Sequence, residues 1–209
     1  MAADLSLNRK YYKYFPFKFL VERIIKRRTE RIVNAFEKFV EKGEKILDVG
    51  AGGGWIAKEI QKRKKAKVAL LDVVDFNQSD LELILYDGKK MPFPENSFDV
   101  VLLIFVLHHV KNPLMVLKEA RRITKNKIII FEDTYFSFFD KIFLIFWDIL
   151  TNLPALIIKP FKEKMPFGFK RVFEWKKTFK KLKTKLIFCE GFAKNKFINQ
   201  TLFILKKCI

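Results

Sequence analysis

The sequence contains little cysteine. Only two of its 209 residues are cysteines, Cys189 and Cys208, and they lie far apart in the chain. Neither belongs to a CxxC pair, so a zinc site built from thiolates is not expected, and no metal is predicted. Cysteines without such partners are typical of reduced thiols in a cytosolic protein. We therefore expect a cytoplasmic location.

Acidic residues are also scarce. The 23 Asp and Glu residues face 42 Lys and Arg residues, which gives a formal net charge of +19. Such a charge favours contact with phosphates, acidic partners or anionic lipid head groups, so nucleic acid and an anionic membrane surface are both candidate partners. A bias toward Lys and Ile also suits a heat-adapted or AT-rich source. Both interpretations of the charge stay open.

Long uninterrupted apolar runs are absent as well. The longest candidate, residues 141–159, is interrupted by Asp148, Asn152 and Pro154, whereas a spanning helix needs about 20 apolar residues. A central Asp costs about 3 kcal/mol in lipid. A buried or lid helix is therefore favoured, and contact with a membrane surface is the alternative, which would make the protein peripheral to a membrane. The first ten residues lack the apolar core of a signal peptide.

Buried-strand patterns alternate with amphipathic helix patterns along most of the chain, and this alternation predicts an open, mostly parallel sheet. Only residues 74–80 separate the second and third expected strands, too few for a helical crossover, so a loop is expected there. The last two strands should form an antiparallel hairpin. We expect helices at about 17–41, 53–65, 112–123 and 173–182, and strands at 44–49, 67–73, 81–86, 98–105, 127–131, 184–189 and 197–205.

A glycine-rich turn follows the first expected strand. Residues 46–55 read Ile-Leu-Asp-Val-Gly-Ala-Gly-Gly-Gly-Trp. A strand that leads into a glycine turn and a helix is how α/β proteins hold a nucleotide-like ligand. Trp55 stands where the dinucleotide fingerprint requires glycine, which argues against a nicotinamide cofactor.

Acidic residues end three of the expected strands: Asp48, Asp72 and Asp87. In parallel sheets, ligands bind beyond the carboxyl ends of the strands. Asp72 is placed to accept hydrogen bonds from ribose hydroxyls, and Asp87 from an exocyclic adenine amine. Asp48 is placed to order the loop or to interact with a cationic group. Three carboxylates suit a pyrophosphate poorly and favour a cofactor that is not an anion at the loop.

Four segments together resemble the class I S-adenosylmethionine-dependent methyltransferases, in particular the type 11, UbiE-like group. They are the glycine turn at 46–54, the acid Asp72, the segment Met-Pro-Phe-Pro-Glu-Asn-Ser-Phe-Asp at 91–99, and Leu-His-His-Val at 107–110 with the helix that follows. The usual Lys-Pro-Gly-Gly turn before the fifth strand is replaced by Thr124–Lys127, and the helix between strands two and three is missing.

The resemblance implies a Rossmann-like, mostly parallel seven-stranded sheet with helices on both faces and a C-terminal antiparallel hairpin. It implies one domain over 1–209, with an N-terminal helical extension at 1–42 and a substrate-side or lid insertion at 134–172. The cofactor would be S-adenosyl-L-methionine. The residues implied to bind it are Asp48, Gly50, Ala51, Gly52, Asp72, Val73, Asp87, Gly88 and Phe105.

The function implied is methyl transfer to a small-molecule or lipid-like acceptor. Methyl transfer from a sulfonium depends on close alignment, so no catalytic residue is obligatory. His108, His109 and Asp133 lie at the right strand ends to act as a base, although positioning or packing explains them as well. Two alternatives remain: an RNA or protein methyltransferase that uses the basic surface, and a non-catalytic module that binds the cofactor.

Overall fold

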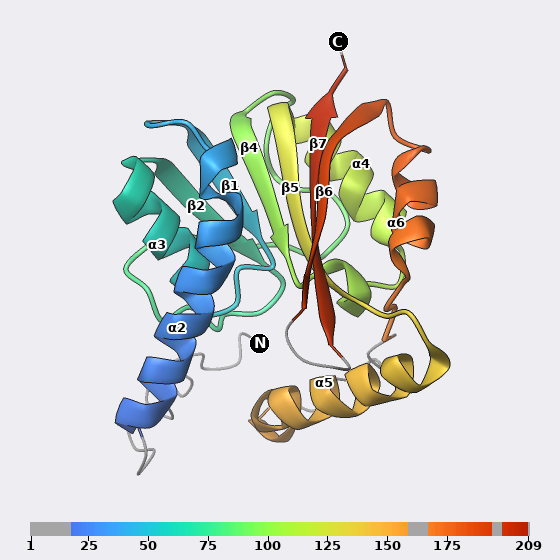
Figure 1. The fold of residues 1–209 in the computed structure, drawn as a ribbon. Helices are drawn as coiled ribbons and strands as arrows, with labels where there is room; N and C mark the ends of the chain where they lie inside the picture. Colours follow the sequence, from blue (N-terminus) through green and yellow to red (C-terminus); the bar gives the residue numbers. More distant parts are fainter. Residues whose placement is uncertain (1–17, 159–166, 194–197, 209) are drawn as a thin grey trace. The chain divides into compact units, whose positions relative to one another are not determined.

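The computed structural model describes residues 18–158, 167–193 and 198–208, and Figure 1 shows its helices and strands. The α-helices are α2 (Lys18–Phe36), α3 (Trp55–Lys64), α4 (Pro113–Ile123), α5 (Phe138–Ile158) and α6 (Val172–Phe179), with 3-10 turns η2 (Glu37–Phe39) and η3 (Leu107–His109). The strands are β1 (Lys45–Val49), β2 (Lys67–Asp72), β3 (Leu83–Leu85), β4 (Phe98–Ile104), β5 (Thr124–Thr134), β6 (Thr184–Ala193) and β7 (Asn199–Lys207).

The seven strands form one sheet in the order β3-β2-β1-β4-β5-β7-β6. β1, β2 and β3 pair in parallel, while β7 runs antiparallel to both β5 and β6. This confirms the predicted α/β class, the mostly parallel seven-stranded sheet and the antiparallel C-terminal pair.

The chain divides into two compact units, each described below by itself. The first unit contains the chain up to Leu102 together with Arg122–Asn126, and the second contains Leu103–Arg121 together with the chain from Lys127 onward. The predicted single domain over 1–209, with its extension and insertion, stays a prediction.

In the first unit, α2 packs its apolar face inward and leaves its basic face in solvent. Ile32, Val33 and Phe36 are buried. Arg63 of α3 joins the two helices, because its guanidinium donates to Asn34 of α2 at 2.5 Å and pairs with Glu37 at 3.2 Å. The helix ends five residues before the predicted position 41, since the chain passes into η2.

The connection between β2 and β3 contains no helix, as predicted. Parallel pairing normally needs a long crossover, but β3 has only three residues, which pair with residues 70–72 of β2. The chain therefore has to travel back only about 7 Å along the strand direction before it can pair again. A loop of ten residues (73–82) covers that path.

The segment at 91–99 is a loop that leads into β4, and Arg122 holds it in place. Its guanidinium donates to the carbonyl of Phe93 at 2.7 Å and to that of Met91 at 3.0 Å. Phe93 packs edge-to-face on Phe98, with 4.9 Å between ring centroids. The carboxylate of Asp99 accepts from the amide of Lys45 at 2.8 Å, which gives this motif a structural role at the start of β1.

In the second unit, the hairpin of β6 and β7 packs against α6. Trp175 and Phe179 of α6 are buried, and Phe179 contacts Phe203 of β7 edge-to-face at 5.1 Å. β6 runs longer than predicted, β7 begins and ends two residues later than predicted, and the register of the pair shifts between Leu186 and Phe188. The predicted hairpin loop at 190–196 shortens, because residues 190–193 belong to β6; residues 194–197 lie outside the described residues.

Helix α5 lies across one end of the β6–β7 hairpin (Figure 1). Its inner side packs Leu144 into a cluster with Tyr135, Phe169 and Ile198. Within the described part of the chain, no helix is both long enough and apolar enough to cross a membrane.

Candidate functional site

The glycine turn after β1 is built from backbone conformations that favour glycine. Gly50 has φ 69° and donates to the carbonyl of Leu71 at 2.7 Å, which ties the turn to β2. Gly52 has φ 52°, and a Cβ added there would meet no atom of the described residues within 4 Å. The backbone at Gly52 therefore faces open space, which allows a ligand to approach it closely.

Gly54 has a different role from Gly52. It has φ 74°, and a Cβ there would lie 2.6 Å from Oγ of Ser79 and 2.9 Å from Oδ1 of Asn77. The loop after β2 also reaches the turn through its backbone, since the amide of Gln78 donates to the carbonyl of Gly53 at 3.1 Å. Gly54 thus serves the packing of this loop.

Asp72 receives hydrogen bonds from the glycine turn and from its own loop. The amide of Gly52 donates to its Oδ2 at 2.9 Å, and the amides of Val73 and Val74 donate to its Oδ1 at 2.7 and 3.3 Å. Burial raises the pKa of this carboxyl, and the three amides oppose that change. The amides fix the orientation of the carboxylate, and Oδ2, which accepts from only one of them, keeps a further lone pair for a ligand hydroxyl.

Asp48 lies buried at the end of β1, with 3% of its surface exposed. The pKa of Asp48 is raised to about 7, mainly because the carboxyl is buried and to a smaller extent because of the charge of Asp72. Two carboxyls so close together form a region that a cationic group would stabilise strongly, because it would offset both the lost hydration and the mutual repulsion.

Asp87 and Gly88 form a turn next to Val73. The exposed carboxylate of Asp87 accepts from the amide of Lys89 at 2.9 Å. Gly88 has φ 78°, and a Cβ there would lie 3.3 Å from Cγ1 of Val73, which is itself 54% exposed. The structure therefore brings Val73 and Gly88 together on an accessible surface.

Eight of the nine predicted cofactor residues belong to the first unit, and Phe105 belongs to the second. Phe105 follows β4 with φ 58°, a left-handed conformation that bulky residues rarely adopt and that recurs at functional sites. Its amide donates to the carbonyl of Phe131 at 2.8 Å, and the two rings meet edge-to-face at 5.3 Å. These two contacts hold the strained conformation.

His108 is one of the predicted catalytic candidates, and it is bound by a buried carboxylate. Its Nδ1 donates to Oε2 of Glu132 at 2.6 Å, and both side chains are almost wholly buried. Oε1 of Glu132 accepts from the amides of Val106 and Leu107 at 2.9 and 2.7 Å. Burial alone would lower the pKa of His108, but the charge of Glu132, together with Asp148, raises it to about 10.

His109 has a different environment. Its ring lies 3.9 Å from that of His108, and its side chain keeps 29% exposure. Burial and the charge on His108 lower the pKa of His109 to about 4, against the opposing charge of Asp148. His109 is therefore neutral and only weakly basic near pH 7, whereas His108 holds its proton.

Asp133, the third catalytic candidate, pairs across the sheet with Gln200, whose side-chain amide donates to the Asp133 carboxylate at 2.7 Å.

Two polar residues next to the histidines, Glu132 and Asp148, were not predicted as site residues from the sequence. Glu132 could have been predicted, because it is an acidic residue at the end of an expected buried strand. No sequence pattern indicated Asp148, because it lies 40 residues beyond His108 and meets it only through the packing of α5.

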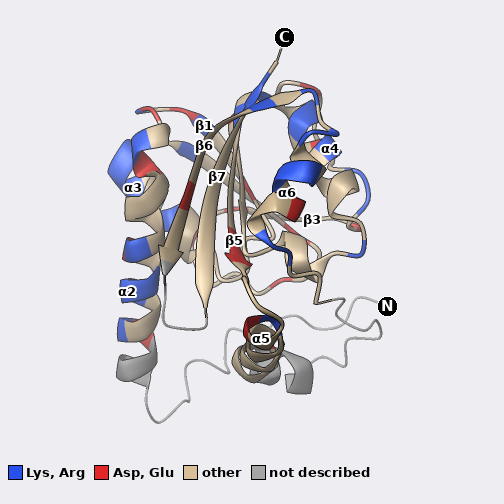
Figure 2. Ribbon diagram, turned by 45° about the vertical axis from the view of Figure 1, so that its right-hand side comes forward, with Lys and Arg blue, Asp and Glu red and all other residues tan. Residues whose placement is uncertain are grey.

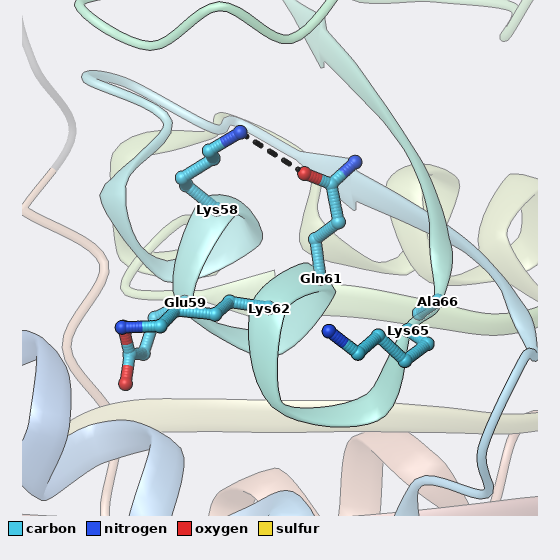
Figure 3. Close-up of a pocket in the computed structure, with 6 residues that line it drawn as sticks. All are labelled: Lys58, Glu59, Gln61, Lys62, Lys65 and Ala66. Atoms are coloured by element: carbon cyan, nitrogen blue, oxygen red, sulfur yellow. Dashed lines mark hydrogen bonds between the residues drawn. The ribbon is translucent and has the colours of Figure 1, made fainter.

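A separate surface depression is lined by residues of α3 and of the chain that directly follows it (Figure 3). Its lining contains no predicted site residue. Lys58 donates to Gln61 within it at 3.2 Å, and Lys58 also pairs with Asp80 at 2.7 Å. We assign no ligand to it. The lining residues are Lys58, Glu59, Gln61, Lys62, Lys65 and Ala66.

Residues 47–131 match the family described as "Methyltransferase domain". Similar proteins include a sterol 24-C-methyltransferase of Gibberella zeae (34% identity; 41% of this chain, 26% of the relative). A demethylmenaquinone methyltransferase of Renibacterium salmoninarum is 33% identical (46% and 44%). The arginine-hydroxylase NDUFAF5 of Rattus norvegicus is 29% identical (58% and 38%). The chain thus spans less than half the length of each of these three relatives.

A solved structure supports the same fold over a larger part of the chain. A SAM-dependent methyltransferase from Aquifex aeolicus superposes with a TM-score of 0.62 and 18% identity, covering 98% of this chain and all of that one. Similarity at this level of identity concerns the fold.

The residues present fit the cofactor that the family implies. The ligand suited to this site carries ribose hydroxyls and also a positive charge. The oriented carboxylate of Asp72 can bind the hydroxyls, the buried carboxyl of Asp48 can stabilise the charge, and the open backbone at Gly52 allows close approach. The family match, the fold and the geometry of the turn therefore agree. Together they support a class I S-adenosylmethionine-dependent methyltransferase, with the family match itself confined to residues 47–131.

Proposed function

We propose that the protein transfers a methyl group from S-adenosylmethionine to a small-molecule, lipid-like acceptor. The observation that carries the transfer reaction is the pairing of Gly52 with Asp72 beside the buried Asp48. Two of the relatives carry names with lipid-like acceptors, a sterol and demethylmenaquinone.

The chain's own residues would bind and orient the cofactor, which supplies an electrophilic methyl group when bound. Asp72 would accept hydrogen bonds from the ribose, and Asp48 would stabilise positive charge. Gly52 would let the backbone approach closely. Alignment of the reacting atoms accounts for much of the acceleration in such a displacement. If the acceptor must lose a proton, His109 is better suited than His108 to take it, because His109 is neutral near pH 7.

Helix α5 supports a lipid-like acceptor, because its outer side is apolar and exposed. Phe139 is 78% exposed, and the other large apolar side chains recur at helical spacing along the same side. A patch of this kind on a soluble surface marks an interaction site, and in an interfacial helix it enters the boundary of a lipid layer. We define the α5 apolar face as Phe138, Phe139, Ile142, Phe146, Ile149 and Leu150.

Cationic residues accompany the α5 apolar face. Lys141 and Arg171 both lie over the ring of Tyr135, at 5.6 and 5.4 Å from its centroid. The sequence after α5 adds Lys159, Lys162 and Lys164. Apolar side chains with neighbouring cations suit an anionic lipid surface, where each cation contributes about 1 kcal/mol. We therefore propose a peripheral location at the cytoplasmic side of a membrane, from which the enzyme would reach its acceptor.

The basic side of α2 favours a second candidate, methylation of RNA. Figure 2 shows Lys and Arg residues along α2, and their side chains are exposed. A cationic helix face of this kind can contact phosphates, and its affinity would fall steeply with salt. The exposed cations are Arg23, Lys26, Arg27, Arg28 and Arg31.

Incubation of the protein with methyl-labelled cofactor and cell extract tests these functions together. We expect label in the lipid or small-molecule fraction. Label in RNA or protein would favour the other two acceptor classes, and cofactor binding without any transfer would identify a non-catalytic module. Asp72→Asn should remove cofactor binding in calorimetry. Asp80→Asn, an exposed acid in the same unit, is the matched control and should bind normally.

A further inference from the structure

Two imidazoles and one carboxylate converge inside the second unit. Nε2 of His108 lies 3.8 Å from Oδ1 of Asp148, and Nε2 of His109 lies 3.7 Å from the same oxygen. The three ligand atoms are all within 4.8 Å of one another. The histidines come from η3 and Asp148 comes from α5, 39 or more residues further along the chain, so the tertiary structure alone assembles them.

The spacing of these atoms is that of ligands around a common centre. Both N···O distances exceed the 2.7–3.2 Å or so of an N–H···O hydrogen bond. Ligands about 2.0–2.1 Å from a tetrahedral zinc ion lie roughly 3.3 Å apart. The observed N···O separations of 3.7 and 3.8 Å are a few tenths of an ångström longer than this, and all three ligand atoms lie within 4.8 Å of one another, so the side chains would move closer together to hold a common ion.

Glu132 orients His108 as a metal-binding histidine requires. The bond from Nδ1 of His108 to Glu132 directs the other ring nitrogen, Nε2, toward Asp148. Carboxylate–histidine–metal arrangements use the same contact to fix the ring and to strengthen the ligand. Phe169 stacks on His108 at 4.5 Å, and the amide of Gly168 donates to the carbonyl of His108 at 2.7 Å. The histidine is therefore held rigidly.

The charges also suit a dication. Glu132 and Asp148 both lie next to the imidazoles, and the field of Asp133 also reaches His108. The other ring nitrogen of His109, Nδ1, is buried, and among the described residues it neither accepts nor donates a hydrogen bond. A metal ion bound at Nε2 would fix this ring, which packs against the ring of His108.

We propose that His108, His109 and Asp148 form a binding site for one divalent transition-metal ion, with Glu132 as the carboxylate that positions His108. Imidazole and carboxylate ligands suit zinc and its neighbours in the first transition row. Three protein ligands leave a coordination position open, which is the arrangement of a site that can also bind water or a substrate oxygen. Metal binding would displace the proton on Nε2 of His108.

Titration of the full-length, chelator-treated protein with Zn²⁺ and with Co²⁺ tests this site. We expect one ion per chain by calorimetry, and a visible absorption spectrum of the bound Co²⁺ typical of tetrahedral or five-coordinate nitrogen and oxygen ligation. His109→Ala and Asp148→Asn should each weaken binding by at least tenfold. Glu132→Gln should weaken it about 10- to 100-fold, as expected for a residue that acts through a ligand.

Asp140→Asn, at the first turn of the same helix, is the matched control and should bind the metal as the wild type does. Circular dichroism of each variant separates loss of binding from loss of folding. His109→Ala is the more informative variant in this respect, because His109 is partly exposed. The proposal is overturned if the wild type binds no more metal than Asp148→Asn, or if His109→Ala leaves the Co²⁺ spectrum unchanged.

Discussion

The amide of Gly52 donates a hydrogen bond of 2.9 Å to Oδ2 of Asp72, 20 residues further along the chain. This bond joins the turn after β1 to the end of β2. It places an exposed stretch of backbone beside a carboxylate whose orientation is fixed by two further amides.

Gly52→Ala should separate cofactor binding from stability. A left-handed alanine costs about 1–2 kcal/mol in unfolding free energy, and the added methyl group would project into the space proposed for the cofactor. We expect that loss of stability, measured by urea denaturation, together with at least a tenfold weaker affinity for S-adenosylmethionine. Gly43→Ala is the matched control, because Gly43 also has a positive φ and open space around it. Equal affinities in the two variants would refute the assignment.

The pKa of Asp48, raised to about 7, makes the stability of the protein depend on pH. Between about pH 4 and 7 the unfolded chain has already lost this proton while the folded protein retains it. Stability should therefore fall as pH rises through that window, by up to about 4 kcal/mol, and the Asp48 contribution should level off above pH 7. Chemical denaturation from pH 4 to 9 measures it, and Asp48→Asn should lack this component.

Cofactor affinity should depend on the same group with the opposite sign. Ionised Asp48 attracts a cation and the protonated form does not, so the dissociation constant should decrease as pH rises toward 7, by at most tenfold per pH unit. It should become constant above that value. Calorimetric titrations at pH 5.5, 6.5, 7.5 and 8.5 check this. A dissociation constant that is flat in the wild type, or equally steep in Asp48→Asn, would contradict the role of Asp48.

Glu132→Gln should destabilise the second unit strongly. The carboxylate is fully buried and accepts from two amides as well as from His108. Removal of one partner from a buried charged pair costs about 3–5 kcal/mol. Glu190→Gln, an exposed acid of β6, should change the unfolding free energy by less than about 0.5 kcal/mol. Thermal and urea unfolding of both variants give the comparison.

Lys65→Gly should stabilise the protein. Lys65 ends α3 in a left-handed conformation with φ 53°, where glycine is the preferred residue. We expect a gain of about 0.5–1 kcal/mol. Lys64→Gly lies one residue earlier, inside the helix, and should instead lose about 1 kcal/mol. Gains or losses of the same sign in the two variants would show that the helix ends elsewhere.

The α5 apolar face leads to a prediction about vesicles. Phe139→Ser combined with Phe146→Ser should lower binding to vesicles that contain anionic lipid by at least tenfold, since each buried aromatic side chain contributes about 1.5–3 kcal/mol. The melting temperature should change little, because both side chains are exposed. Phe173→Ser, an exposed aromatic on α6, is the control. Unchanged co-sedimentation of the double variant would remove the proposed membrane contact.

Local pattern was sufficient for most of the fold. Buried strands such as β1 and β4 appear as continuous apolar runs, because a parallel sheet covers both of their faces. The loop after β2 was predictable from its length alone. The ends of elements were harder to predict: α2 stops at Phe36, where the chain passes into η2, and β5 begins at Thr124, whose hydroxyl donates to the distant carbonyl of Asp99.

For the site, the sequence by itself determined the glycine turn and the acids that follow the strands, because each lies at a strand end that its own neighbours define. The pairing of Gly52 with Asp72 follows from the parallel register of β1 and β2. Only the tertiary structure decided what surrounds the histidines. Asp148 meets His108 and His109 through the packing of α5, and Glu132 becomes a buried partner only when β5 lies beside the chain that follows β4. Contacts between side chains so far apart in the sequence leave no local pattern, since they depend on where whole elements pack.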